Sequence, residues 1–281
     1  AKAFELAEKE GFVFVHPFQD PLVIAGQGTI GLEIMQAVPD LESIVVPIGG
    51  GGLISGIATA IKNLSPRVKV IGVQSQQASG MKHLFEKTDL RVQGKITTIA
   101  DGIAVKNPSR LMYDSFIERL VDEIVEVSDD EIAEAIVFLL ERAKTVTEGS
   151  GAAAMAAAMN RKLPLGNKTC ILLCGGNIDL NVIAKVIDRG QIKRGRLVEL
   201  SVIVDDLPGS LSRLTEVMAK NRANILEVHH DRVTQGLYLR ETRIDFVLET
   251  SSAEHAEDIK KALEATGARL SLRNVSGFNR S

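Results

Sequence analysis

The sequence lacks any uninterrupted apolar run close to the roughly 20 residues that a helix needs to cross a bilayer. It also lacks an excess of charge, because 33 basic residues stand against 36 acidic ones. This balance gives no general attraction to nucleic acid or to a membrane surface. The first residues, AKAFELAEKEGFVFV, lack the layout of a signal peptide and are typical of a helix end followed by a strand. We therefore expect no nucleic-acid or membrane partner, and a chain that begins within a fold.

Cysteine is scarce, with Cys170 and Cys174 both in the strand-like segment KTCILLCGG. On a strand, residues four positions apart have Cα atoms roughly 13 Å apart, which exceeds the roughly 7 Å limit for a disulfide. The sequence therefore predicts two reduced thiols and a cytoplasmic location.

The length and the order of the segments predict two domains. With 281 residues, 45% of them hydrophobic, the chain is long for one domain. From residue 12 onward, short β-branched runs alternate with helix-period stretches, the pattern of a parallel sheet with helices on both faces. Strands are expected at 12–18, 42–49, 68–74, 123–128 and 169–175. We predict an α/β domain with a parallel sheet over residues 1–195.

The helices of this domain carry local signals of their own. Asp20 and Pro21 are typical of an N-cap and the first helical residue. Ser128, with Glu131 three residues later, predicts a capping box. The helix after residues 49–52 is expected to bury one face, formed by Ile54, Ile57, Ala58 and Ile61. Further helices are expected at 151–160 and 179–189.

A second domain is predicted after the basic stretch RGQIKRGR at 189–196. The elements there follow the order β-α-β-β-α-β, which indicates a ferredoxin-like sandwich over residues 196–281. A turn containing Gly236 is expected between the two middle strands, and a Ser251/Glu254 capping box at the second helix. The first strand is expected to turn inward Val198, Leu200, Val202 and Val204.

Two glycine-rich stretches could hold a phosphate. GQGTIG at 26–31 matches the dinucleotide fingerprint but lacks a preceding strand and an acidic residue about 20 positions later. Close helix packing is the better interpretation there. VPIGGGGLISG at 46–56 has the strand–turn–helix context, but lacks the third glycine of that fingerprint and the Lys-Ser/Thr of a P-loop. Its row of backbone N–H groups at a helix N-terminus suits a lone phosphate. It therefore indicates a phosphorylated cofactor such as pyridoxal phosphate (PLP), with a purely structural turn as the alternative.

Several segments, taken in chain order, carry a family resemblance. HPFQDPLVIAGQGTIGLEI, VPIGGGGL, TIADGIAV and LLCGGNID resemble the serine/threonine dehydratases, which are fold-type II PLP enzymes with a tryptophan-synthase-β-like fold. DDLPGSLSRL with ANILEVHHDR resembles an ACT regulatory domain. Together they are similar to the threonine dehydratases (threonine ammonia-lyases) that have one C-terminal ACT domain. The resemblance implies a lyase that converts threonine to 2-oxobutanoate and ammonia, in isoleucine biosynthesis or threonine catabolism.

The resemblance also implies a cofactor site. Cys174 stands where the family usually has a serine facing the pyridine nitrogen; a neutral thiol is a weak hydrogen-bond partner, so that nitrogen is expected to stay unprotonated. Core packing of a free cysteine is the alternative. Glu148, in an EPAGA-like segment, is expected near the cofactor, although a helix dipole explains it equally well. Asp101 and Gly102 match a loop lining the site. The phosphate would be held by the backbone amides of Gly49, Gly50, Gly51, Gly52 and Leu53.

No metal site is predicted. Related enzymes bind a divalent cation through a Glu at the end of the strand that corresponds to VIGVQ, where this chain has Gln74. Gly80 stands in place of a second carboxylate. His229, His230 and Asp231 form only a weak ligand pattern, which alternation along one strand explains better.

The motifs that would carry the chemistry are missing from this sequence. The resemblance requires a Schiff-base lysine in a Ser-x-Lys-x-Arg-Gly-like motif and a Ser-x-Asn-His/Gly loop for the substrate carboxylate. Both normally precede the matching segment, in a smaller lobe of about 100 residues. No catalytic residue is therefore assigned within this chain. A fragment is the favoured interpretation, with a split subunit and a degenerate protein as alternatives.

The ACT-like segment implies an amino-acid effector, isoleucine or valine. By the resemblance, it binds where two ACT domains pair in a homo-oligomer. Two other functions stay open: a non-catalytic amino-acid-binding regulator, and a serine dehydratase or other β-eliminase. The effector residues that the resemblance implies are Leu207, Pro208, Gly209, Ser210, Asn224 and Ile225.

Overall fold

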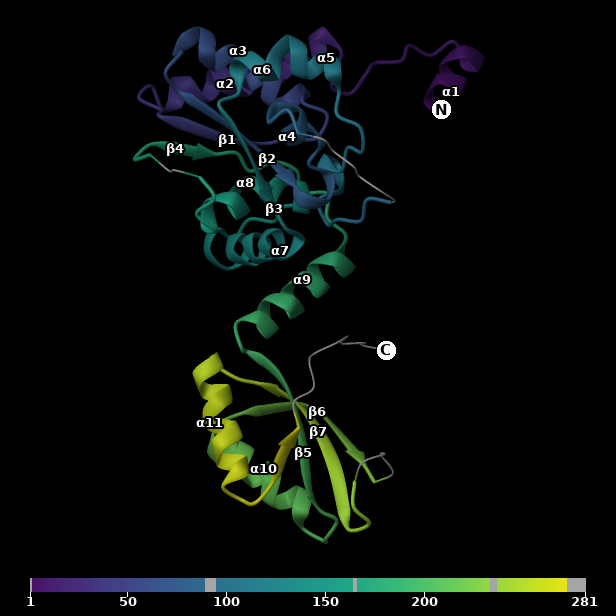
Figure 1. The fold of residues 1–281 in the computed structure, drawn as a ribbon, viewed down its shortest axis with the longest axis vertical. Helices are drawn as coiled ribbons and strands as arrows, with labels where there is room; N and C mark the ends of the chain where they lie inside the picture. The colour runs from purple at the N-terminus through teal and green to yellow at the C-terminus, as the bar shows by residue number, and fades with distance from the viewer. Residues whose placement is uncertain (1, 89–94, 164–165, 233–236, 272–281) are drawn as a thin grey trace. The chain divides into compact units, whose positions relative to one another are not determined.

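Two sheets organise the chain, one parallel and one antiparallel (Figure 1). The computed structural model describes residues 2–88, 95–163, 166–232 and 237–271. The chain divides into two units, Ala1–Val186 and Ile187–Ser281, and the division falls within helix α9 (Leu180–Lys193).

The first unit is built on four parallel strands in the order β3-β2-β1-β4. Their bounds are β1 Ser43–Pro47, β2 Lys69–Ser75, β3 Glu123–Val127 and β4 Thr169–Ile171. All five residues of β1 are buried, as expected for a central strand covered on both faces. The parallel α/β architecture predicted from the alternating segments is confirmed.

Helices cover both faces of this sheet. Figure 1 shows α2 (Pro21–Ala37) and α3 (Gly52–Leu64) on one side, and α7 (Asp129–Phe138) and α8 (Gly149–Met159) on the other. Each side has its own apolar core. None of the helices in the described ranges is long and apolar enough to cross a membrane. Four further α-helices belong to the unit: α1 Lys2–Glu10, α4 Gly80–Phe85, α5 Arg110–Met112 and α6 Glu118–Leu120.

The local helix signals are confirmed. The Asp20 carboxylate accepts the backbone N–H of Leu22 at 2.8 Å, and Pro21 begins α2. Glu131 and Ser128 form both hydrogen bonds of the capping box. The four apolar residues expected on one face of α3 are all fully buried.

Two strand predictions need correction. Residues 11–16 form no strand, and 17–19 form a turn. Phe12, Val13 and Val15 are exposed, because no described strand lies beside them to complete a ladder. β4 ends at Ile171 rather than at residue 175, since the chain beyond it leaves the ladder to reach the start of α8.

The second unit is an antiparallel sheet in the order β6-β7-β5-β8 with two helices. The ferredoxin-like order is confirmed, and its core contains Leu200, Val202 and Phe246 from the sheet. Val198 and Val204 are only half-buried. The bounds are β5 Leu197–Asp205, α10 Ser210–Lys220, β6 Asn224–Asp231, β7 Glu241–Glu249, α11 Ala253–Glu264 and β8 Arg269–Ser271.

The predicted Ser251/Glu254 capping box is wrong by one residue. Ser252 is the N-cap of α11, and its hydroxyl accepts the backbone N–H of His255 at 3.2 Å. The backbone N–H of Ser251 donates instead to His255 Nδ1 at 3.1 Å. The imidazole thus accepts a backbone N–H one residue before the one that the glutamate of a capping box would accept. The turn expected at Gly236 lies outside the described residues.

Candidate functional site

The glycine-rich turn between β1 and α3 is shaped by two segments that press against it. A methyl group on Gly50 would overlap the Phe18 ring, and one on Gly52 would lie 2.9 Å from Phe18 Cα. On Gly49 it would lie 3.1 Å from the carbonyl oxygen of Gly102. Gly51 has φ +101°, which side-chain-bearing residues rarely adopt. Close approach or backbone conformation therefore accounts for all four glycines.

The same turn presents a row of backbone donors. Within the described part of the chain, the N–H groups from Gly49 to Ile54 have no hydrogen-bond acceptor, and the first intrahelical bond is Ser55 N–H to the Gly51 carbonyl at 3.0 Å. Gly50, Gly51 and Gly52 are buried. Unpartnered donors at the positive end of a 13-residue helix are the arrangement that an anion requires, and this turn is therefore the candidate phosphate site.

Gln74 fixes the strand that leads into the turn. The side chain is 1% exposed; its amide donates to the Ile48 carbonyl at 3.3 Å and accepts the Lys82 N–H at 2.9 Å. The Lys82 ammonium lies 3.2 Å from Glu86 and 3.7 Å from Glu126. Among the described residues, no group of three or more His, Cys, Asp or Glu could hold a metal ion.

The loop at 98–103 lies against both the glycine turn and the start of α8. It is held by Asp129, which accepts the Thr98 hydroxyl at 2.5 Å and the Ile99 N–H at 3.1 Å. A methyl group on Gly102 would lie 2.8 Å from the Ser150 hydroxyl. Asp101 is exposed and accepts the neighbouring N–H of Gly102 at 2.8 Å. The structure therefore brings Gly49, the Asp101–Gly102 loop and α8 together.

Glu148 is the N-cap residue of α8, but its side chain makes no capping hydrogen bond. Its carboxylate accepts the backbone N–H of Asn177 at 3.2 Å, and its own N–H donates to the Gly175 carbonyl at 3.2 Å. Burial raises the pKa of the neighbouring Cys174 thiol, and the charge of Glu148 raises that pKa further. Cys174 is half-buried and, like Cys170, forms no disulfide, as predicted.

Three side chains near these segments were not singled out from the sequence. Phe18 lies on the glycine turn, and nothing in the sequence pattern indicated this packing. Thr147 and Ser150 are 3% and 4% exposed, and within the described residues their hydroxyls have no hydrogen-bond partner. Ser and Thr flanking a helix start were the available signal for the latter two.

The residues expected to bind an effector are not gathered in one place within the unit. Register pairs Asp205 with Glu241 at one end of the sheet and Asn224 with Glu249 at the other. The segment from Leu207 to Ser210 follows β5 at the first end, whereas Asn224 and Ile225 are the first two residues of β6 at the second.

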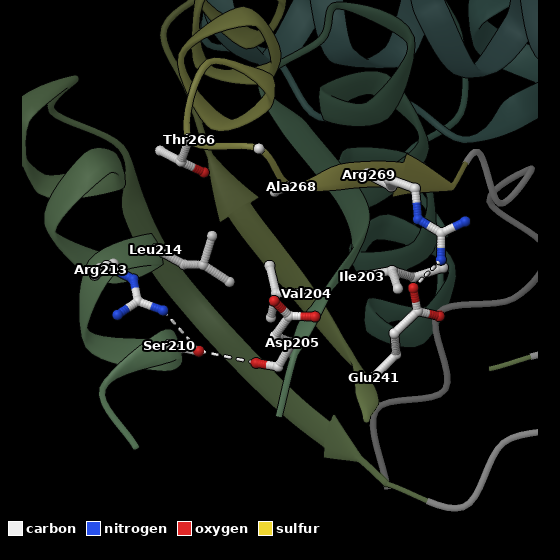
Figure 2. Close-up of a pocket in the computed structure, with 11 residues that line it drawn as sticks. Ile203, Val204, Asp205, Ser210, Arg213, Leu214, Glu241, Thr266, Ala268 and Arg269 are labelled. Carbon is white, nitrogen blue, oxygen red and sulfur yellow. Dashed lines mark hydrogen bonds and ion pairs between the residues drawn. The ribbon is translucent and has the colours of Figure 1, made fainter. Parts of the chain in front are cut away.

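A cavity of about 190 Å³ opens beside Ser210 (Figure 2). The Ser210 hydroxyl donates to the Asp205 carbonyl at 2.9 Å and accepts from Arg213 at 2.9 Å. Figure 2 shows Ser210 and Arg213 on one side and Glu241 with Arg269 on the other. Arg269 pairs with Glu241 at 2.5 Å, while Arg213 has no carboxylate partner among the described residues.

The first unit matches a known family over most of its length: residues 1–175 match the family described as pyridoxal-phosphate dependent enzyme. The chain belongs to this family. Residues 198–268 match the ACT domain, so that this PLP-family chain carries a regulatory module after its parallel-sheet unit.

Two relatives of this PLP-family chain are L-threonine ammonia-lyases. That of Thermotoga maritima is 48% identical over 271 residues, 96% of this chain and 67% of the relative. That of Geobacter sulfurreducens is 47% identical over 269 residues, 95% of this chain and 66% of the relative. The processed form of threonine deaminase isoform 2 from Solanum lycopersicum superposes with TM-score 0.61 at 36% identity, over 68% of this chain and 53% of that one. The chain thus spans about two thirds of the length of the first two relatives.

The site fits the family's cofactor. A phosphate monoester needs several N–H donors and no metal-holding side chain, and the unpartnered N–H row from Gly49 to Ile54 supplies such donors. The buried hydroxyls of Thr147 and Ser150 leave further hydrogen-bonding capacity in the adjoining segment.

Proposed function

We propose that this chain takes part in the PLP-dependent deamination of threonine to 2-oxobutanoate and ammonia, under the control of an amino acid bound to its ACT domain. The observation that carries the proposal is the unpartnered N–H row at the start of α3. The similarity to two L-threonine ammonia-lyases supports the substrate. The two free thiols favour a cytoplasmic location.

In this proposal the chain anchors the cofactor at two ends. The backbone amides of Gly49 to Leu53 hold the phosphate, aided by the α3 dipole. Cys174 would face the pyridine nitrogen; as a neutral thiol, whose pKa burial raises further, it would donate at most a weak hydrogen bond to that nitrogen. When bound, PLP supplies the electron sink that makes the α-proton of an amino acid removable.

The group that takes this proton is not among the assigned residues. By the resemblance it is a lysine in a Ser-x-Lys-x-Arg-Gly-like motif, and the 281 residues contain no such motif. We infer that the lysine is supplied from outside this sequence. The chain's own share of the reaction is then to bind and orient the cofactor.

A two-part experiment tests the proposal. Binding of PLP to the chain is measured by equilibrium dialysis, and the chain is then co-purified with the third of the Thermotoga maritima relative that this chain does not cover. We expect saturable PLP binding in the first part, and 2-oxobutanoate formation from threonine in the second. PLP binding without turnover of threonine, but with turnover of serine, would favour a serine dehydratase.

The missing lysine motif keeps a second function in view, that of a non-catalytic amino-acid-binding regulator. Calorimetry separates the two. Isoleucine binding by the chain together with no PLP binding would favour the regulator.

For the effector we propose isoleucine or valine, bound at the α10 end of the ACT sheet. The cavity beside Ser210 is large enough for about six water volumes, which suits a small amino acid. Arg213 is available for the carboxylate. We further propose that the chain forms a homo-oligomer in which paired ACT domains bring Asn224 and Ile225 of one copy toward the effector of another. Calorimetric titration of the two amino acids, alongside the mass of the assembly with and without them, checks both points.

A further inference from the structure

The loop from Cys174 to Asn177 is attached to the first turn of α8 by an unusually close fit. A methyl group on Gly151 would overlap the Cys174 carbonyl. Gly175, with φ +75°, faces the Glu148 carboxylate so closely that a methyl group there would overlap it. Two glycines, one on each segment, therefore allow contact between the loop and the helix start.

Glu148 supplies the two hydrogen bonds across this contact. Its backbone N–H reaches the Gly175 carbonyl, and its carboxylate receives the Asn177 N–H, each at 3.2 Å. The carboxylate leaves the α8 donors that it could have capped and turns toward the loop. It stays at the N-terminal end of the 11-residue helix.

We propose that Glu148 is a positioning residue for Cys174: it clamps the Cys174–Asn177 loop onto α8 and thereby fixes where the thiol points. This rests on the proposed function only for its consequence, a thiol held toward the pyridine nitrogen. The clamp itself is a property of the chain without cofactor.

The clamp has a second effect on the thiol. Burial raises the pKa of Cys174, and the charge of Glu148 raises it in the same direction. The carboxylate thus raises the pKa of the thiol further, while the backbone contacts hold the loop in place. Charge and attachment are separable, because glutamine retains the acceptor for Asn177 but not the charge.

The test measures the rate at which an aromatic disulfide reagent modifies Cys174, as a function of pH, in cofactor-free chain carrying Cys170→Ser. The apparent pKa of the profile reports the charge, and the plateau at high pH reports access to the thiolate. Glu148→Gln should lower the apparent pKa and give a plateau no higher than that of the Cys170→Ser parent, because a thiolate of lower pKa is a weaker nucleophile. Below the pKa the rate should rise about threefold for each unit lost, since a tenfold gain in thiolate is partly offset by lower nucleophilicity.

Glu148→Ala should lower the apparent pKa and also raise the plateau several-fold, because the loop is released. Gly175→Ala provides a second route to release, since its methyl group would displace the carboxylate. It serves as well if Glu148→Ala fails to give a cooperative thermal transition. Glu33→Gln, on the exposed face of α2, is the matched control and should leave both quantities unchanged.

Equal profiles for Glu148→Gln and Glu33→Gln, together with an unchanged plateau in Glu148→Ala or Gly175→Ala, would overturn the proposal. Failure of the proposed function would appear elsewhere, as absence of PLP binding in dialysis. The two results are independent, because the thiol measurement uses no cofactor.

Discussion

Helices α3 and α8 begin in opposite ways within the same unit. α3 starts at glycines whose N–H groups have no acceptor in the described part of the chain, and no charged side chain caps it. α8 starts at Glu148, a carboxylate that stays beside the helix end and ties a neighbouring loop to it. Both helix ends carry the same partial positive charge. Among the described residues, the first has no acidic side chain at its start, and the second has the carboxylate of Glu148 beside it.

The start of α10 in the second unit follows the pattern of α3. Gly209 has φ +89° and offers no capping side chain, as Gly51 does in α3. A cavity lies beside it, lined by Arg213. The comparison teaches that a bare helix start goes with a proposed ligand in both units, whereas the start that carries a carboxylate has a proposed positioning role.

The largest effect is expected where α8 is closest to its loop. Gly151→Ala places a methyl group on the Cys174 carbonyl, a backbone group that cannot move aside locally. The free energy of unfolding should fall by about 3 kcal/mol, measured by urea denaturation. Gly26→Ala is the control, because nothing lies within 4 Å of its methyl group inside α2; there the free energy should rise by about 0.5–1 kcal/mol. A similar loss in both variants would show that α8 has no special fit.

The next effect concerns the open start of α3. Gly51→Ala forces a side chain into φ +101°, at a strain cost of about 1–3 kcal/mol, and the turn relaxes by reorienting the N–H row. PLP affinity should therefore fall about tenfold or more, measured by equilibrium dialysis on folded protein. Gly26→Ala is again the control. If Gly51→Ala binds PLP as tightly as Gly26→Ala does, the phosphate does not bind at this turn.

A smaller effect is expected at α10. Arg213→Gln removes an exposed guanidinium from the cavity, and effector affinity should fall about fivefold, corresponding to about 1 kcal/mol. Calorimetry with isoleucine and valine measures it. Lys220→Gln, at the far end of the same helix, should change affinity little. If the two variants bind alike, the effector lies elsewhere on the ACT domain.

The smallest expected effect is on the pH dependence of stability, where the influence of Glu148 on a thiol can be distinguished from that of burial. Burial raises the pKa of Cys170 and of Cys174, and Glu148 adds to the latter. Below the unfolded thiol pKa of about 8.5, both states are protonated and this contribution to stability is fully present. As pH rises further, the unfolded thiols ionise first, so the free energy of unfolding should fall until the folded thiols ionise too. Urea denaturation across this range checks it. Cys174→Ser should reduce the pH dependence of the free energy of unfolding more than Cys170→Ser does. Equal reductions would show that Glu148 does not contribute to the pKa of Cys174.

The elements that sequence reasoning located correctly are those with local causes. Ser128 and Glu131 satisfy each other within one turn, and Asp20 caps α2 through its own neighbours. The glycine turn could be located because strand and helix periodicities meet there. Its packing partner Phe18 could not, since the approach of a ring to a turn more than 30 positions away depends on the whole unit.

The failures have equally physical causes. Residues 12–16 have strand-forming composition, but a strand requires a neighbour, and none is among the described residues. At α11, the Ser251/Glu254 spacing favoured Ser251, but the hydroxyl of the next serine, Ser252, accepts the His255 N–H and caps the helix. For Glu148 the sequence indicated a helix start. The bond to Asn177 joins positions 29 residues apart and is visible only in the fold.

Lys82 has a consequence for the ionic conditions under which the chain can be handled. Its ammonium lies beside Glu86 and Glu126, where the ends of β2 and β3 meet α4. A counter-charge that is covalently part of the chain cannot be washed out by a chelator or exchanged for a different ion. The positive charge beside Glu86 and Glu126 is thus supplied by the chain itself.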